Sequence, residues 1–179
     1  MFASTARDFI EKAIAGDREF LAKFDPAIDR DAFEAEWQAR SSGARSEVNS
    51  FEPNYEGSSI VAGKPGATCS AIGSHQYVAR AGHHLAPRQL SSGRSVFEEL
   101  GTGFTLLDFG APDAAAEIAR AAAATGVPLK LIRDDSTKLR EFYKAALILV
   151  RPDQFAAWVS DGDVKDAAAI VSRAIGDHP

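Results

Sequence analysis

The sequence contains a single cysteine, Cys69, among 179 residues. One thiol excludes an intrachain disulfide and the Cys-x-x-Cys motif of dithiol redox proteins. A reactive thiol also needs an electropositive setting, and the Ser-, Gly- and Ala-rich stretch around Cys69 does not show one. We therefore interpret Cys69 as a small structural side chain, with a redox or nucleophilic role as the alternative.

The chain also lacks an excess of positive charge, since 20 Lys and Arg stand against 25 Asp and Glu for a formal net charge of −5. Nothing in this distribution forms the basic stripe that nucleic acids or anionic membranes attract. No apolar run approaches the roughly 18 residues that span a bilayer, and no apolar signal core follows residues 1–7. These absences predict a cytoplasmic protein that binds neither nucleic acid nor a membrane.

Phosphate-binding motifs are missing as well, because the sequence has neither Gly-x-Gly-x-x-Gly nor Gly-x₄-Gly-Lys-Ser/Thr. His83 and His84 are the most conspicuous polar pair, but adjacent histidines on an extended chain face opposite ways, and a metal site needs further ligands. His75 would be a third, with no helical or Cys-x-x-Cys partner. We predict hydrogen-bonding loop histidines, and no catalytic, cofactor-binding or metal residue in this chain.

Two carboxylate pairs, Glu98-Glu99 and Asp134-Asp135, are the other candidates for acid–base chemistry. Neighbouring acids on a helix surface or in a turn are normally solvated, and a catalytic pair needs a cleft that the sequence does not reveal. We predict that both pairs are exposed to solvent.

Three segments follow one another along the chain. Residues 1–43 form a helical segment, with apolar stripes predicting helices over 4–24 and 29–40. These wide stripes pack either on the C-terminal domain or on another domain or subunit. Residues 44–93 form an irregular connecting segment rich in Gly, Ser and Pro, which we expect to wrap over a surface or bridge two domains. Its best strand candidates are residues 58–61 and 76–79.

Residues 94–179 alternate between helical and strand-like patterns, ending in a hairpin and a closing helix that Asp163 caps. The predicted helices are 95–100, 113–125, 137–144 and 163–175, and the predicted strands are 104–109, 129–132, 146–150 and 155–159. The order β-α-β-α-β-β-α predicts an α/β, thioredoxin-like, three-layer domain. Two helical crossovers predict that the first three strands are parallel and the fourth antiparallel.

In a thioredoxin, the working thiols follow the first strand of this unit, at the N-terminus of the next helix, where the helix dipole lowers a thiol pKa. Here that place reads Gly110-Ala111-Pro112-Asp113, without cysteine, serine or histidine. Residue type therefore excludes redox chemistry of the thioredoxin kind, and we interpret Asp113 as a helix cap.

The run from Gly82 to Leu107, GHHLAPRQLSSGRSVFEELGTGFTLL, resembles the start of the C-terminal domain of flavin-dependent aromatic-ring hydroxylases, the phenol hydroxylase-like monooxygenases. The run from Glu141 to Trp158, EFYKAALILVRPDQFAAW, is similar to a later element of that family. Asn54–Ser58 resembles an element of its connecting segment. The resemblance covers roughly residues 45–162, and GFTLL combined with VRPDQ is specific.

The sequence departs from the family pattern in the loop around the two histidines. Ala81 stands where the family has proline before Gly82. The arginine, proline and histidine of the family fall on His84, Ala86 and Pro87. This loop is therefore a variant of the family's loop.

The resemblance implies a non-catalytic structural or dimerisation domain that binds no cofactor, with FAD implied only for a full-length family member or a partner. The expected partner is a second copy of the chain or a flavin domain. One hypothesis is that this flavin domain is a separate subunit onto which the chain docks. The helices before residue 41 would correspond to the tail of the catalytic part. The alternative is a stand-alone small enzyme or redox protein that uses Cys69 or the His83-His84 loop.

Overall fold

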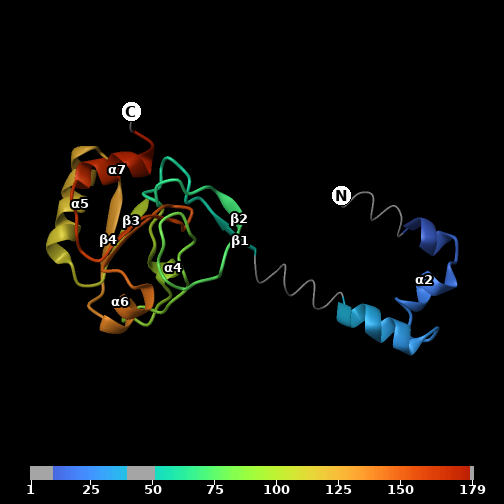
Figure 1. Ribbon diagram of the computed structural model, residues 1–179. Coiled ribbons are helices and arrows are strands. Elements are labelled where there is room, and N and C mark those ends of the chain that lie inside the picture. Colours follow the sequence, from blue (N-terminus) through green and yellow to red (C-terminus); the bar gives the residue numbers. More distant parts are fainter. Residues whose placement is uncertain (1–9, 40–50, 178–179) are drawn as a thin grey trace. The chain divides into compact units, whose positions relative to one another are not determined.

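The computed structural model describes residues 10–39 and 51–177, which belong to two units that divide between residues 50 and 51. Figure 1 shows the helical N-terminal unit and the larger C-terminal unit. The predicted boundary between residues 43 and 44, and the outer ends of both predicted N-terminal helices, lie outside the described residues. Among the described helices, none is both long and apolar enough to cross a membrane.

The N-terminal unit contains short helices. Helical residues are 10–14, α2 (Arg18–Ala22) and 30–39. The prediction of one helix over 4–24 is wrong, because Gly16 takes a left-handed conformation (φ +69°) that interrupts the helix. The Asp17 side chain then caps α2 by accepting a hydrogen bond from the Phe20 amide at 3.1 Å.

The C-terminal unit is a mixed α/β structure built on a four-stranded sheet of order β4-β3-β5-β6. The strands are β3 (Phe104–Asp108), β4 (Leu129–Arg133), β5 (Leu147–Val150) and β6 (Ala156–Ser160). The helices are α4 (Val96–Glu99), α5 (Pro112–Ala124), α6 (Thr137–Tyr143) and α7 (Ala167–Ile175). The α/β class predicted from the sequence is confirmed.

The direction of the third strand corrects the sequence prediction. β3 and β4 are parallel, but β5 runs antiparallel to β3, and β6 runs antiparallel to β5. α6 has seven residues and is about 10 Å long at 1.5 Å per residue, shorter than the roughly 17 Å of a five-residue strand. The chain therefore does not return to the far end of the sheet, and it enters β5 from the end at which β4 leaves.

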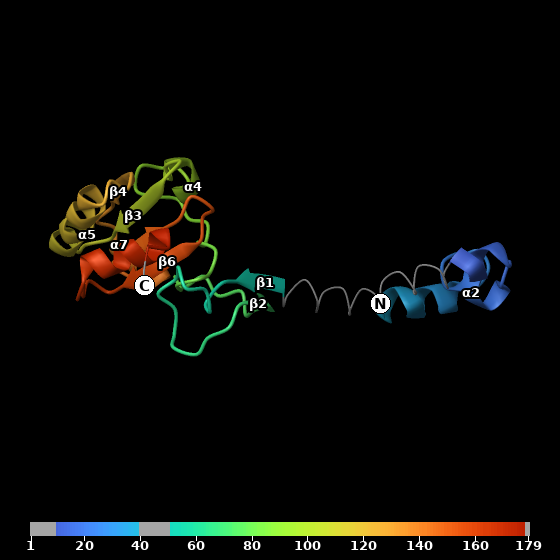
Figure 2. The same cartoon turned by 90° about the horizontal axis from the view of Figure 1, so that it is seen from above.

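The sheet separates two apolar clusters, and β5 contributes to both. Leu147 and Leu149 pack with α5 and α7 on one face, whereas Ile148 and Val150 pack with α4, α6 and the segment 79–100 on the other. All four side chains are 2% exposed or less. Figures 1 and 2 show α5 and α7 together on one side of the sheet, with α4 on the other.

Residues 51–93 contain a short antiparallel ribbon of β1 (Phe51–Asn54) and β2 (Ser70–Ile72). The predicted strands are wrong. Residues 58–61 form turns, with the Val61 amide donating to the Ser58 carbonyl, and residues 76–79 form no strand. Alternation over four residues does not distinguish a strand from a turn whose apolar side chain is buried, as that of Val61 is at 3% exposed.

The start of α7 also differs from the sequence prediction. The capping residue is Asp166, whose side chain accepts from the Ala169 amide at 2.9 Å, and not Asp163. The Asp163 carbonyl instead accepts a hydrogen bond from the Ser160 hydroxyl at 2.8 Å, which holds the chain in a turn before the helix. Two aspartates were available as caps, and this local hydrogen bond selects the second.

We predict that Ile148→Ala lowers the free energy of unfolding by about 2–5 kcal/mol, because it leaves a cavity in a packed face of β5. Urea unfolding of the full chain measures this. The matched control is Ile72→Ala, since Ile72 in β2 is 67% exposed and its truncation changes stability by about 0.5 kcal/mol or less. Equal losses for the two variants would contradict the assignment of the core.

Candidate functional site

The turn between β3 and α5 joins the carboxyl end of a parallel strand to a helix N-terminus. Ligand-binding and active sites often lie at such turns. Here the turn is closed by Asp108, which is 2% exposed. Its Oδ1 accepts from the amides of Gly110 at 3.0 Å and Ala111 at 2.7 Å. The amides that an anion would use at this turn are thus bound by the protein's own carboxylate.

The cap predicted at Asp113 is wrong. The N-cap position is Ala111, which has no side-chain cap bond, and Pro112 opens the helix. Asp113 lies in the first turn, where a negative charge interacts favourably with the helix dipole. The role of Asp108 could not be predicted from the sequence, because this residue lies inside the apolar run of a strand.

His83 lies buried between two carboxylates that precede it in the chain by about 30 residues. Its Nδ1 is 3.0 Å from Glu52 Oε1 and its Nε2 is 2.7 Å from Glu56 Oε1. The Arg80 guanidinium donates to the same Glu52 oxygen at 2.6 Å. We call Glu52, Glu56, Arg80 and His83 the His83 cluster.

The contacts of the His83 cluster lower the pKa of the Glu52 side chain. Burial acts to raise the pKa of Glu52, but hydrogen bonds from the His75 amide and from His83, together with the Arg80 charge, outweigh burial and hold that pKa below its ordinary value. Arg80 Nε is a buried donor without an acceptor in the described part of the chain. The guanidinium is therefore positioned by Glu52 at the expense of one unmade hydrogen bond.

His84 points to different partners, as adjacent residues on an extended chain do. Its ring packs on Phe97 and Phe155 with centroid distances of 5.5 and 5.3 Å. Its nitrogens face the Leu85 carbonyl at 3.0 Å and the Gln154 amide oxygen at 3.1 Å. The two histidines are therefore not brought together on one ligand, and both serve as hydrogen-bonding loop residues.

Cys69 is exposed and lies directly before β2. The alternative of a stand-alone enzyme or redox protein that uses Cys69 or the His83-His84 loop stays a hypothesis. A search of the described ranges found no group of three or more His, Cys, Asp or Glu side chains able to hold a metal ion.

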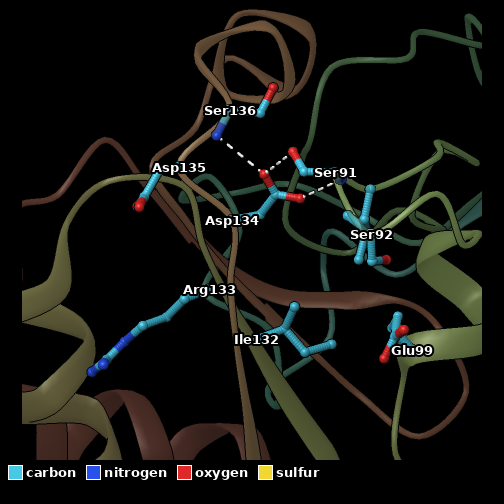
Figure 3. Close-up of a pocket in the computed structure, with 9 residues that line it drawn as sticks. Ser91, Ser92, Glu99, Ile132, Arg133, Asp134, Asp135 and Ser136 are labelled. Atoms are coloured by element: carbon cyan, nitrogen blue, oxygen red, sulfur yellow. Dashed lines mark hydrogen bonds between the residues drawn. The ribbon is translucent and has the colours of Figure 1, made fainter.

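A cleft of about 630 Å³ opens between the loop 90–92 and the end of β4. Figure 3 shows Asp134 at its centre, held by Ser91 and Ser136. One carboxylate oxygen accepts from the Ser91 hydroxyl at 2.7 Å and the Ser136 amide at 3.1 Å, and the other from the Ser91 amide at 2.7 Å. Asp134 thus ties the loop 90–92 to the start of α6.

Asp134 is 7% exposed, so the prediction of a solvated pair is wrong for this residue, whereas its neighbour Asp135 is exposed as expected. Burial acts to raise the pKa of Asp134, but the three hydrogen bonds from Ser91 and Ser136 outweigh it and leave the pKa below its ordinary value. A carboxylate held in this way stays ionised and is a weak general base.

A profile of the family described as "Aromatic-ring hydroxylase, C-terminal" matches residues 78–178. The chain therefore belongs to this family of aromatic-ring hydroxylase C-terminal domains, and the resemblance read from Gly82–Leu107 and Glu141–Trp158 is confirmed. A search of curated proteins found no match.

Several solved structures are similar to this chain. RebC-10x, solved in native and K252c-bound form, is 30% identical to this chain with a TM-score of 0.67. The match covers 86% of this chain and 30% of the RebC-10x chain. RebC with bound 7-carboxy-K252c is 27% identical to this chain with a TM-score of 0.67. The match covers 96% of this chain and 35% of the RebC chain. Aklavinone-11 hydroxylase with FAD and aklavinone is 24% identical to this chain with a TM-score of 0.54, and the match covers 66% of this chain and 25% of the hydroxylase chain. At this identity the likeness shows the fold alone.

The chain spans about a third or less of the length of these proteins. Two features of the chain are unfavourable for binding a flavin dinucleotide. The sequence has no Gly-x-Gly-x-x-Gly turn, and the helix N-terminus after β3 is closed by Asp108. No chemical step through flavin is therefore assigned to residues of this chain.

We predict that Asp134→Asn destabilises the full chain by about 1–3 kcal/mol at pH 7, because one carboxylate oxygen becomes an amide NH₂ that faces a donor. The lowered pKa of Asp134 stabilises the wild type above the ordinary value of 3.8, and this contribution is lost as the pH falls below it. The difference between the two proteins should therefore shrink between pH 7 and pH 3.

Urea unfolding at several pH values measures this difference. Asp135→Asn, at the exposed neighbouring position, is the matched control and should change stability by about 0.5 kcal/mol or less. A constant difference between wild type and Asp134→Asn from pH 7 to pH 3 would show that the carboxylate charge contributes nothing.

Proposed function

We propose that this chain is the thioredoxin-like C-terminal domain of an FAD-dependent aromatic-ring hydroxylase, and that it serves assembly and not catalysis. The observation that carries the proposal is the turn between β3 and α5. There Gly110–Asp113 offers no nucleophile, and Asp108 occupies the amides. A thioredoxin-like domain without its thiols retains a packed sheet whose outer surfaces can bind other domains.

The strand arrangement supports the thioredoxin-like part of the proposal. The first two strands of the order β-α-β-α-β-β-α are parallel, and the last two form an antiparallel hairpin, in the spatial order β4-β3-β5-β6. α5 and α7 cover one face, and α6 with the segment 79–100 covers the other. This arrangement supports the three-layer organisation expected from the sequence.

The N-terminal unit supports a role in assembly. Among its described residues only Ala22 is a buried apolar side chain, whereas Ile10, Ile14 and Trp37 are 54%, 82% and 61% exposed. A unit of this size that buries so little apolar surface gains little stability by itself, and exposed apolar patches mark interaction sites. We propose that these side chains pack on a second copy of the chain or on a flavin-bearing domain.

The flavin-bearing domain is the partner that the solved structures favour. The match to RebC covers 96% of this chain within a single longer protein, so most of the N-terminal unit has a counterpart there. Aklavinone-11 hydroxylase and PieE are described in complex with FAD. We propose that FAD chemistry belongs to such a partner and that both act in the cytoplasm.

We predict that the full chain does not retain FAD. After incubation with excess FAD and desalting, its absorbance spectrum should show no flavin band, because the sequence has no Gly-x-Gly-x-x-Gly turn and Asp108 occupies the amides after β3. A flavoprotein hydroxylase treated in the same way is the positive control. Retention of one FAD per chain would overturn the proposal that FAD is bound by a partner and not by this chain.

We predict that Trp37→Ser weakens association of the full chain by about tenfold or more, since buried tryptophans carry a large share of interface energy. Sedimentation velocity measures association with itself and with the flavin-bearing part of a hydroxylase. The matched control is the exposed neighbour Gln38→Ser, which should associate like wild type. A wild-type chain that remains monomeric and binds no flavin-bearing part would contradict the proposal.

A further inference from the structure

The His83 cluster fastens the segment by which the chain enters the C-terminal unit. Glu52 lies in β1 and Glu56 follows it, and both reach His83 at 3.0 and 2.7 Å. Between them, the Tyr55 amide donates to the Gly82 carbonyl at 2.7 Å. The Gly82 amide in turn donates to the Ala156 carbonyl of β6 at 2.7 Å.

Gly82 is required for this close approach. It takes a left-handed conformation (φ +85°), and a Cβ there would lie 2.6 Å from the Glu56 amide nitrogen. The incoming segment 51–56 therefore lies directly on the backbone of the loop that carries Arg80 and His83. Side-chain and backbone bonds hold the same two segments together.

Both ring nitrogens of His83 face oxygens that only accept hydrogen bonds when the carboxylates are ionised. A neutral imidazole has one N–H, so it satisfies one glutamate and turns a lone pair toward the other. A protonated imidazolium donates to both. The observed geometry is therefore complete only with the ring protonated.

The charges of the His83 cluster lead to the same conclusion. Glu52 and Glu56 carry two negative charges, and Arg80 supplies one positive charge. A protonated His83 brings the sum to zero, whereas a neutral ring leaves one uncompensated charge in a partly buried group whose His83 side chain is 5% exposed. Uncompensated charge away from water is costly.

We propose that the His83 cluster is a proton-coupled clasp, closed over the segment 51–56 when His83 is protonated and loosened when the ring becomes neutral. This inference does not rest on the proposed function. The groups recorded against the ring are Glu52 from β1, Glu56 from the following turn and, through Glu52, Arg80 from its own loop. His84 faces away, toward Phe97 and Phe155.

The direction of the pH dependence follows from which state binds the proton. The closed state holds the proton on His83, so closure is favoured at low pH and is lost as the pH rises and the ring gives up that proton. At the acid end the clasp depends on ionised carboxylates. The pKa of Glu52 lies below its ordinary value of 4.5, so its charge persists to about that pH and below.

The protonation state of the ring is tested first, on the wild-type full chain. Long-range ¹H–¹⁵N NMR spectra should show both His83 nitrogens protonated at pH 6, with the ring losing its proton on titration toward pH 8.5. His84 serves as the internal control, because its two partners carry no charge and the Gln154 amide can turn its NH₂ toward a neutral ring. A neutral His83 tautomer at pH 6 would overturn the proposal.

The coupling is tested by hydrogen exchange at the Tyr55 amide, corrected for the intrinsic pH dependence. Its protection should fall as the pH rises from 6 to 8, by up to about tenfold per pH unit since one proton is involved. The Phe109 amide, bound to the Ala146 carbonyl beside the sheet, should show no such change.

Three variants complete the test. His83→Gln and Glu56→Gln should remove the pH dependence of Tyr55 protection, and the matched control His84→Gln should retain it. Persistence of the wild-type dependence in His83→Gln would overturn the proposal. If His83→Gln does not fold, Glu56→Gln and the wild-type NMR titration give the same decision, because each reports on the proton held between His83 and Glu56.

Discussion

Burial of β5 on both faces is the constraint on which the rest of the C-terminal unit depends. Its odd and even side chains enter different apolar clusters, so the four residues of one short strand join the two halves of the core. β5 also lies between β3 and β6 in the sheet, and its backbone groups are bonded on both sides. No other strand among the described residues combines an interior position in the sheet with burial of every side chain.

Much of this unit could be predicted from the sequence, because local patterns specify it. The continuous apolar run of β5 predicts burial on both faces, and Gly and Pro bound β3 and α5. The direction of β5 could not be predicted in this way, since it depends on how far α6 travels before the chain turns. The start of α7 was equally ambiguous, because Asp163 and Asp166 are both good caps and a hydrogen bond from Ser160 decides between them.

The candidate site could be predicted only in part, for a similar reason. His83 and His84 stand out as a pair, and their opposite orientations follow from extended backbone geometry. The partners of His83 lie 27 and 31 residues earlier, in a segment whose own pattern suggested no strand. Asp134 looks like half of a solvated pair until the Ser91 loop covers it. In both cases the missing information is a long-range contact, which periodicity does not encode.

The buried polar groups of the C-terminal unit hold its own segments together, and this bears on the proposed role. Asp108 closes the turn after β3, Asp134 ties a loop to the start of α6, and His83 holds the incoming segment. Each buried carboxylate has its acceptor capacity engaged by amides, hydroxyls or cations of the chain itself, which leaves little for a substrate. In the N-terminal unit, the apolar side chains of Ile10, Ile14 and Trp37 are exposed. This contrast between engaged polar groups and exposed apolar side chains supports the proposed role in assembly.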